Sequence, residues 1–291
     1  MSTVATSPVE HVSLSKDWRD WVQTNIDRGC TIESMVDQMV AAGLERAFAL
    51  RNVIALKSAA NIKPHVTTSN SAKYIAGPSR LPGDHVIEIE GHRVQVMARW
   101  RRPLIAVLDN VLSPAECEEL MEASRVKLQR STVADPNSGA RSVIQARTSE
   151  GTWWDRNSTD LITKIDNRLS KLTGWAVEHG EGLQVMRYGV GGEYKPHFDY
   201  FPPEQKGSAF HMARGGQRVA TMLMYLQPPL KGGETTFPDV GISIIPKQGS
   251  AVFFEYMDES GNLDSMTLHA GAPVIQGEKW IATRWIRERA F

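Results

Sequence analysis

The chain has 291 residues, of which 41% are hydrophobic and 23% are charged, the mix of a globular protein that can bury a sizeable core. Its 33 Lys and Arg residues balance 33 Asp and Glu residues, which argues against a protein that binds nucleic acid through a general basic surface. The only cysteines, Cys30 and Cys117, exclude a disulfide framework and a cysteine-type zinc site. No apolar run is long enough to span a bilayer and no secretory signal is visible, so we expect a cytoplasmic protein with no membrane partner. The sequence leaves the oligomeric state open.

The first part of the chain predicts a small helical module. Trp18 and Trp21 recur at helical spacing, and two further short amphipathic helices follow, the last over residues 44–60. Residues 61–83 are rich in Pro, Ser, Thr, Asn and Gly, which is typical of a linker. We therefore assign residues 1–83 to a helical N-terminal module and its linker, and interpret the module as packing on the main domain or docking a partner.

The remainder, residues 84–291, predicts a mainly β domain with supporting helices. A capping box at Ser113-Pro114-Ala115-Glu116 opens one helix, and a second is expected over residues 158–172, after a long loop segment at 129–157. Short β-branched and aromatic segments alternate with Gly and Pro turns, and the expected strands lie at residues 85–90, 93–100, 104–108, 183–188, 194–198, 217–226, 242–246, 249–255, 266–272 and 280–287. Many short strands at this spacing indicate a sandwich or barrel, and a double-stranded β-helix, or jelly roll, fits the order best.

One strand of this domain carries a candidate pair of metal ligands, His197 and Asp199. Residues i and i+2 of a strand point to the same side, so an imidazole and a carboxylate converge there. His269 lies on a later predicted strand, and a barrel can bring it beside the first two. Two histidines and one carboxylate form the facial triad that holds Fe(II) and leaves positions open. Ten residues further on, Lys279 is a cation on a long stem, suited to a carboxylate inside a pocket.

These residues and their surroundings resemble the prolyl 4-hydroxylase branch of the Fe(II)/2-oxoglutarate-dependent dioxygenases. The resemblance covers about residues 100–291, and its motifs are Gln184…Tyr188…Gly192…Tyr194…His197-Phe198-Asp199-Tyr200-Phe201, Gly232-Gly233-Glu234-Thr235-Thr236-Phe237-Pro238, Pro246-Lys247-Gln248-Gly249-Ser250-Ala251, and His269…Pro273-Val274…Gly277-Glu278-Lys279-Trp280…Trp285-Ile286-Arg287. The related AlkB-like and small-molecule branches generally use arginine where this chain has Lys279. The lysine therefore favours the prolyl hydroxylase branch.

The resemblance implies a jelly-roll core and a role for each matched residue. It assigns His197, Asp199 and His269 to iron and Lys279 to the distal carboxylate of 2-oxoglutarate, and it places Tyr188 near that cosubstrate. No catalytic residue beyond the metal centre is implied.

Two further groups of residues are candidates for the same site. Thr221 and Tyr225 are four apart on one strand, so they share a face and are expected to line the cosubstrate pocket. The segment from Arg147 through Ser149 to Trp153 is similar to the Arg-x-Ser-x-Gly stretch of the family, which lies on a mobile loop over the substrate groove. Arg147 would bind a peptide carbonyl there, and Trp153 would stack on a proline ring.

The function implied by the resemblance is hydroxylation of a C–H bond with release of succinate and CO2. The expected substrate is a prolyl residue in a proline-containing peptide or protein, and ascorbate is the expected reductant. Three alternatives stay open. The same chemistry acts on a free amino acid or secondary metabolite, the barrel is a metal-binding sensor without turnover, or the main role of the protein lies in its helical N-terminal module, with the barrel as an accessory.

Overall fold

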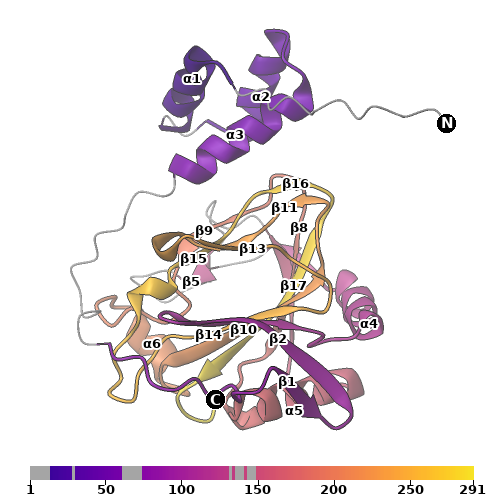
Figure 1. The fold of residues 1–291 in the computed structure, drawn as a ribbon, viewed down its shortest axis with the longest axis vertical. Coiled ribbons are helices and arrows are strands. Elements are labelled where there is room, and N and C mark those ends of the chain that lie inside the picture. The colour runs from indigo at the N-terminus through magenta and orange to yellow at the C-terminus, as the bar shows by residue number, and fades with distance from the viewer. Residues whose placement is uncertain (1–13, 28–29, 61–73, 131–132, 135–140, 143–148) are drawn as a thin grey trace, which may run out of the picture. The chain divides into compact units, whose positions relative to one another are not determined.

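The computed structural model describes residues 14–27, 30–60, 74–130, 133–134, 141–142 and 149–291. It divides into two compact units, Met1–Lys63 and Pro64–Phe291, each with its own core (Figure 1).

The first unit contains the three predicted helices. They are α1 (Lys16–Asp27), α2 (Ile32–Ala41) and α3 (Arg46–Ala60). Thr31 caps α2 by accepting a hydrogen bond at its hydroxyl from the backbone N–H of Ser34. Val22, Met39 and Val53, one from each helix, are fully buried. The helices therefore enclose a small apolar core of their own.

The second unit is built on two facing sheets. The large sheet has nine strands in the order β1 (Val86–Ile89), β2 (His92–Arg101), β3 (Leu104–Asp109), β14 (Ala251–Glu255), β10 (Arg218–Gln227), β17 (Lys279–Arg287), β8 (Leu183–Tyr188), β7 (Glu150–Trp154) and β4 (Gln129–Arg130). The small sheet has the order β13 (Ile242–Ile244), β12 (Thr235–Phe237), β15 (His269–Gly271) and β9 (Tyr194–His197). Two short pairs complete the strands, β11 (Lys231–Gly232) with β16 (Val274–Gln276) and β5 (Val133–Ala134) with β6 (Arg141–Ser142).

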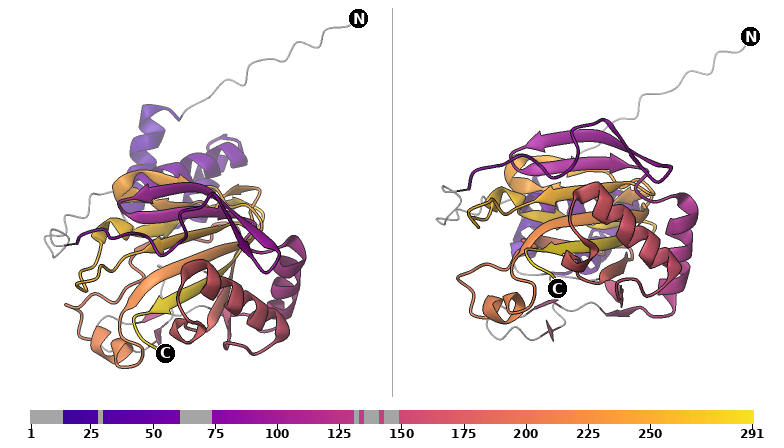
Figure 2. Two further views of the ribbon diagram at one scale, coloured as in Figure 1. Left: turned by 60° about the horizontal axis from the view of Figure 1, so that its bottom comes forward. Right: turned by 90° about the horizontal axis from the view of Figure 1, so that it is seen from below.

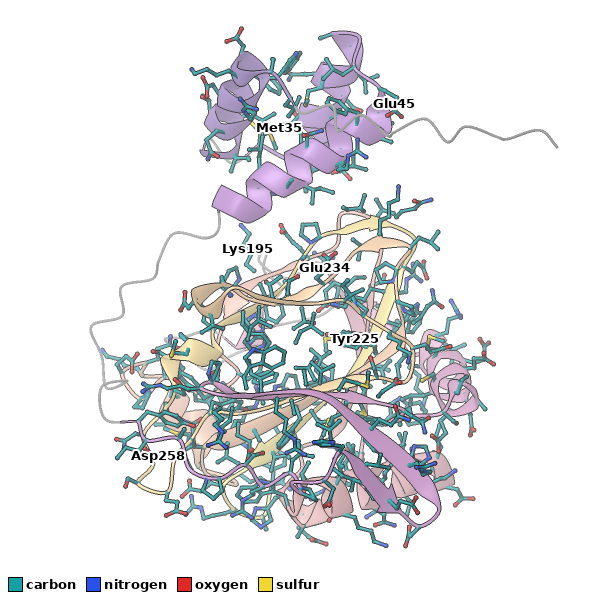
Figure 3. The ribbon with its side chains drawn as sticks, in the orientation of Figure 1. Met35, Glu45, Lys195, Tyr225, Glu234 and Asp258 are labelled. Carbon is teal, nitrogen blue, oxygen red and sulfur yellow. The ribbon has the colours of Figure 1, made fainter. Side chains whose placement is uncertain are left out.

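Alternation along the central strand β10 explains why this sheet is buried on both faces. Met222 and Met224 belong to a core shared with the helices, whereas Leu223 and Tyr225 belong to a core enclosed by the two sheets. Successive strand residues point to opposite faces, so a strand covered on both sides is apolar throughout. Tyr225 lies in the interior between the two sheets (Figure 3).

Helices α4 (Pro114–Arg125) and α5 (Asp160–Thr173) cover the outer face of the large sheet (Figure 2). The predicted capping box of α4 is present, since the Ser113 hydroxyl accepts from the N–H of Glu116 and the Glu116 carboxylate accepts from the N–H of Ser113. That carboxylate also accepts two hydrogen bonds from Arg168 of α5, at 2.7 and 2.8 Å. Burial by itself would raise the pKa of Glu116, but Arg168 and the cap hold it well below its ordinary value. One buried ion pair thus joins the two helices.

The jelly-roll fold is confirmed, with three local differences from the expected elements. The hairpin between β1 and β2 turns at Glu90 and Gly91, both with positive φ, one residue earlier than expected. Strand β7 lies inside the segment expected to be a loop, because its backbone pairs with β8. Residues 74–83, assigned to the linker, lie against the second unit, where the Ser79 hydroxyl and the Arg80 N–H donate to the Glu255 carboxylate. The expected boundary between residues 83 and 84 stays a prediction, as does the role of the first unit.

Candidate functional site

Two short strands bring the three predicted metal ligands together. Strands β9 and β15 are paired so that His197 lies directly opposite His269, and Asp199 follows His197 by two residues. Nε2 of His197 is 3.7 Å from one carboxylate oxygen of Asp199, and Nε2 of His269 is 3.6 Å from the other. One ligand atom from each residue lies within 4.8 Å of the other two, and this is the only such His, Cys, Asp and Glu cluster among the described residues.

The hydrogen bonds of the two imidazoles fix which ring nitrogen carries the proton. Nδ1 of His197 lies 2.8 Å from the carbonyl oxygen of Lys195, and Nδ1 of His269 lies 3.0 Å from that of Thr267. A carbonyl oxygen only accepts, so each Nδ1 is the protonated donor and each Nε2 carries a lone pair. Both lone pairs are on the side of the carboxylate, as a metal requires. The ring of Tyr194 stacks on His197 with the centroids 3.5 Å apart, which restricts that imidazole further.

Asp199 is buried and is held as a carboxylate. Burial by itself would raise its pKa, but His269, His197, Arg218 and the Thr221 hydroxyl lower the pKa below the ordinary value. An ionised carboxylate with the Nε2 atoms of two imidazoles beside it is the donor set of a divalent transition metal. The chemistry of the three residues therefore fits the iron that the sequence predicts.

A pocket of about 420 Å³ opens beside the triad, between the two sheets. It is lined by the three candidate ligands and by Met186, Tyr188, Tyr194, Leu223, Thr235, Ala270, Gly271, Lys279, Ile281, Thr283 and Trp285. Four of these alternate along β17, at positions 279, 281, 283 and 285, as side chains on one face of a strand do. The pocket thus has the triad on one wall and a lysine on another.

Lys279 is buried in this pocket without a counter-charge in contact. Its side chain is 3% exposed, and within the described residues its ammonium makes no hydrogen bond or ion pair. The rings of Tyr225 and Tyr188 lie 5.6 and 5.8 Å from the ammonium nitrogen. Burial lowers the pKa of Lys279 to about 8, and Glu234 offsets part of that shift. A cation desolvated in this way is a ready binding group for an anion.

Of the three further pocket candidates, one lines the cavity. Tyr188 does so, and it lies opposite Lys279 in the pairing of β8 with β17. The Thr221 hydroxyl instead donates to Asp199, and the Tyr225 hydroxyl donates to Thr235 at 2.7 Å. Neither Thr221 nor Tyr225 is among the lining residues, and each hydroxyl is directed to a residue outside the large sheet, Asp199 or Thr235.

The three candidates for substrate binding are found in different settings. Arg147 lies outside the described residues. Ser149 is fully buried beside β7 rather than presented to solvent. Trp153 is 37% exposed, and its ring lies 5.7 Å from that of Trp285, which lines the pocket. Trp153 does not itself line the pocket, and its role in substrate binding stays a prediction.

Several lining residues were not predicted from the sequence, among them Tyr194, Thr235 and Trp285. For Trp285 the signal was its even spacing from Lys279 on a single strand, which indicates a shared face. Tyr194 and Thr235 come from β9 and β12 of the small sheet, and only the pairing of these strands through β15 brings them to the pocket.

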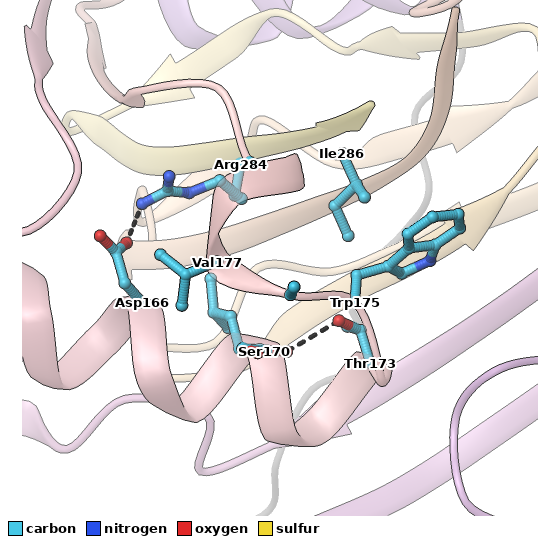
Figure 4. Close-up of a pocket in the computed structure, with 10 residues that line it drawn as sticks. Asp166, Ser170, Thr173, Trp175, Val177, Arg284 and Ile286 are labelled. Atoms are coloured by element: carbon cyan, nitrogen blue, oxygen red, sulfur yellow. Dashed lines mark hydrogen bonds and ion pairs between the residues drawn. The ribbon is translucent and has the colours of Figure 1, made fainter. Parts of the chain in front are cut away.

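A second pocket, of about 270 Å³, lies between α5, the 3₁₀ turn η1 (Val177–His179) and β17 (Figure 4). Its charged lining residues already face each other, since Arg284 is paired with Asp166 and also donates to the carbonyl oxygen of Glu181. This pair explains the burial of both side chains. Arg284 is therefore held by Asp166 of α5 and is not available to bind the cosubstrate carboxylate in place of Lys279.

Comparisons with known proteins agree with the site. Residues 183–287 match the model of the 2OG-Fe(II) oxygenase superfamily. Over 208 residues the chain is 39% identical to the probable prolyl 4-hydroxylase 10 of Arabidopsis thaliana, covering 65% of this chain and 70% of that protein. The chain belongs to the prolyl 4-hydroxylase family of 2OG-Fe(II) oxygenases.

Two other members of the family show how far the likeness extends. The chain is 40% identical over 190 residues to prolyl 4-hydroxylase subunit alpha-1 of Rattus norvegicus, covering 65% of this chain but only 35% of that subunit. It is 33% identical to the viral collagen prolyl hydroxylase of Paramecium Bursaria Chlorella virus-1, whose structure was solved as a complex with 2OG, with a TM-score of 0.50 over 63% of this chain and 95% of that one. The residues that match the family model, 183–287, therefore lie in the second unit. The cofactors of the family, Fe(II) and 2-oxoglutarate, match the triad and the pocket beside it.

Proposed function

We propose that this chain is an Fe(II)- and 2-oxoglutarate-dependent dioxygenase that hydroxylates a prolyl residue in a peptide or protein, with release of succinate and CO2. The observation that carries the proposal is the buried, unpaired Lys279 in the same pocket as His197, Asp199 and His269. A site that only held a metal would have no use for a desolvated cation, whereas a dicarboxylate cosubstrate needs one.

Each part of the pocket has a separate task. His197, Asp199 and His269 would hold the metal through two Nε2 atoms and a carboxylate, and Lys279 would pair with the distal carboxylate of 2-oxoglutarate. When bound, the iron and its cosubstrate supply the oxidation of a C–H bond by dioxygen. Tyr188 and the apolar lining residues exclude water, which strengthens the ion pair at Lys279.

Two indole rings beside the pocket support a substrate that carries an apolar ring. Trp285 lines the pocket, and the part-exposed ring of Trp153 lies 5.7 Å from it. The names of the relatives, which are prolyl 4-hydroxylases, support a prolyl substrate for this chain as well.

The direct test is an incubation of the full chain with Fe(II), 2-oxoglutarate and a library of proline-containing peptides. We expect succinate together with a peptide mass gain of one oxygen atom. Turnover of free proline or of small metabolites, but of no peptide, would assign the same chemistry to the first alternative. Metal binding without succinate under any condition would assign the barrel to the metal-binding sensors. Omission of ascorbate should reduce the number of turnovers if it is the reductant, as we propose.

Two parts of the proposal concern the cellular compartment and the partners of the protein. No helix among the described residues is long and apolar enough to cross a membrane. We keep the cytoplasm as the proposed compartment and propose no nucleic-acid partner, in line with the zero net charge.

Replacing Trp153 with alanine tests its predicted role in substrate binding. We expect the KM for the peptide to rise at least about tenfold, because a ring that stacks on substrate contributes about 1.5 kcal/mol or more. Decarboxylation of 2-oxoglutarate in the absence of peptide should be largely spared, and steady-state kinetics with and without peptide measures both. Met97→Ala removes another exposed apolar side chain, from β2, and is the control. Equal loss of both activities in Trp153→Ala would indicate a structural role instead.

A further inference from the structure

Behind the candidate metal ligand Asp199, two buried hydroxyl groups form a short chain. The Thr221 hydroxyl lies 2.7 Å from Oδ2 of Asp199 and 3.1 Å from the hydroxyl of Tyr256. Thr221 and Tyr256 are fully buried, and Asp199 is 7% exposed. Neither Thr221 nor Tyr256 lines the pocket, so neither contacts a bound cosubstrate directly.

The direction of each hydrogen bond follows from the number of protons available. The ionised Asp199 carboxylate only accepts, so the single hydroxyl proton of Thr221 is donated to it. Thr221 then has no proton left for Tyr256, and the phenol must donate to the threonine oxygen. The chain therefore runs from Tyr256 through Thr221 to Asp199. Hydrogen bonds in such a chain strengthen one another because each donor is polarised by the bond it accepts.

Both hydroxyls are carried by residues that the large sheet holds through its backbone hydrogen bonds. Thr221 is on the central strand β10, paired with Phe254 of β14 on one side and Trp285 of β17 on the other. Tyr256 follows β14 directly, and its N–H donates to the carbonyl oxygen of Val219. Asp199, in contrast, lies in the segment that leaves β9. The donors are thus fixed by the large sheet, whereas the carboxylate that accepts from them is not held by strand pairing.

We infer that Thr221, supported by Tyr256, is a positioning residue that fixes the orientation of the Asp199 carboxylate for metal binding. The inference rests on the metal site of the proposed function. With Oδ2 held by Thr221, the carboxylate keeps one oxygen toward each imidazole, as the 3.7 and 3.6 Å separations from His197 and His269 require. Without that hydrogen bond the Asp199 carboxylate would rotate about its Cβ–Cγ bond. Metal binding would then have to select one orientation from several, which costs conformational entropy.

The test measures metal affinity rather than turnover. Anaerobic titration with Co(II), followed by visible absorption, reports both the dissociation constant and the symmetry of the site. For Thr221→Val, which keeps the shape and removes the hydroxyl, we expect at least about tenfold weaker Co(II) binding and a changed absorption spectrum. Thr221→Ser keeps the donor and should bind within about threefold of the wild type.

A double-mutant cycle with Tyr256→Phe separates positioning from general destabilisation. If Tyr256 acts through Thr221, Tyr256→Phe weakens Co(II) binding in the wild-type background but has no further effect in Thr221→Val. Thr173→Val is the matched control, because it removes a buried threonine hydroxyl that donates to a helix carbonyl in α5. That variant should lower the melting temperature without changing the Co(II) affinity.

The outcomes separate this inference from the proposed function. Wild-type affinity in Thr221→Val, or equal losses in Thr221→Ser and Thr221→Val, would overturn the positioning role while leaving the metal site intact. Absence of Co(II) binding by the wild type, or unchanged binding in His197→Ala, would overturn the metal site itself. If Thr221→Val does not fold, the single variant Tyr256→Phe decides, since weaker Co(II) binding at an unchanged melting temperature supports the chain and unchanged binding refutes it.

Discussion

Alanine in place of His197 or Asp199 is expected to abolish succinate production that depends on iron. Each substitution removes one of three donors from a site in which the remaining two cannot hold a labile divalent metal in place. His197→Ala also frees space beside Tyr194, but both side chains lie at the edge of the barrel core, so the fold should persist. Turnover and anaerobic Fe(II) binding, measured on the same preparations, check the two expectations together.

The control for this prediction is His211, which stacks on Phe201 and belongs to no metal-ligating cluster of the described residues. Succinate production by the His211→Ala variant should still depend on iron. Wild-type turnover in both His197→Ala and Asp199→Ala would refute the triad. Tight binding of Zn(II) to the wild type would not, because Zn(II) outranks Fe(II) in intrinsic affinity for such donors and would act as an inhibitor.

The sequence was sufficient for those parts of the site that lie on one strand or carry a strong motif. Spacing of two placed His197 and Asp199 on one side of the chain, and the distance of ten residues between His269 and Lys279 matched a family pattern. The capping box at Ser113 was equally local and predicted the start of α4. Each of these features depends on neighbours a few residues apart, and such neighbours are visible in a sequence.

Features that depend on pairing between distant strands were not visible. The face shared by Thr221 and Tyr225 was predicted, but their hydroxyl partners were not, because Asp199 and Thr235 come from parts of the chain outside β10. Strand β7 was taken for a loop for the same reason, because residues 150–154 have no clear alternation and owe their extended form to pairing with β8. Tertiary context decided these cases.

Replacing Lys279 with alanine should raise the KM for 2-oxoglutarate at least about ten- to a hundredfold. A hydrogen bond to a charged group contributes about 1.5–3 kcal/mol, and each 1.4 kcal/mol is a factor of ten. Removal of the lysine also leaves the distal carboxylate in a pocket with little water, which adds to the loss. Iron binding should change little, because Lys279 is not among the clustered ligands. Steady-state kinetics with varied 2-oxoglutarate and an anaerobic Fe(II) titration measure the two effects.

Neither Arg218 nor Arg284 is free to replace this lysine. Arg218 is held by two hydrogen bonds to Glu181, at 2.7 and 2.9 Å, and Arg284 is paired with Asp166. Lys279→Arg should restore only part of the affinity, since the guanidinium fork is wider than an ammonium and places its donors differently. An unchanged KM in Lys279→Ala would show that the cosubstrate binds elsewhere.

The pH dependence of cosubstrate binding gives the same assignment a second, independent test. The pKa of Lys279 is about 8 in the empty pocket, because burial disfavours the charged form. A bound carboxylate stabilises the ammonium and raises that pKa, so the complex keeps a proton that the free enzyme loses as the pH rises. The KM for 2-oxoglutarate should therefore be flat below pH 8 and rise by up to about tenfold per pH unit above it. In Lys279→Arg the guanidinium stays charged over this range, so the rise above pH 8 should disappear, and its persistence there would assign the titration to another group.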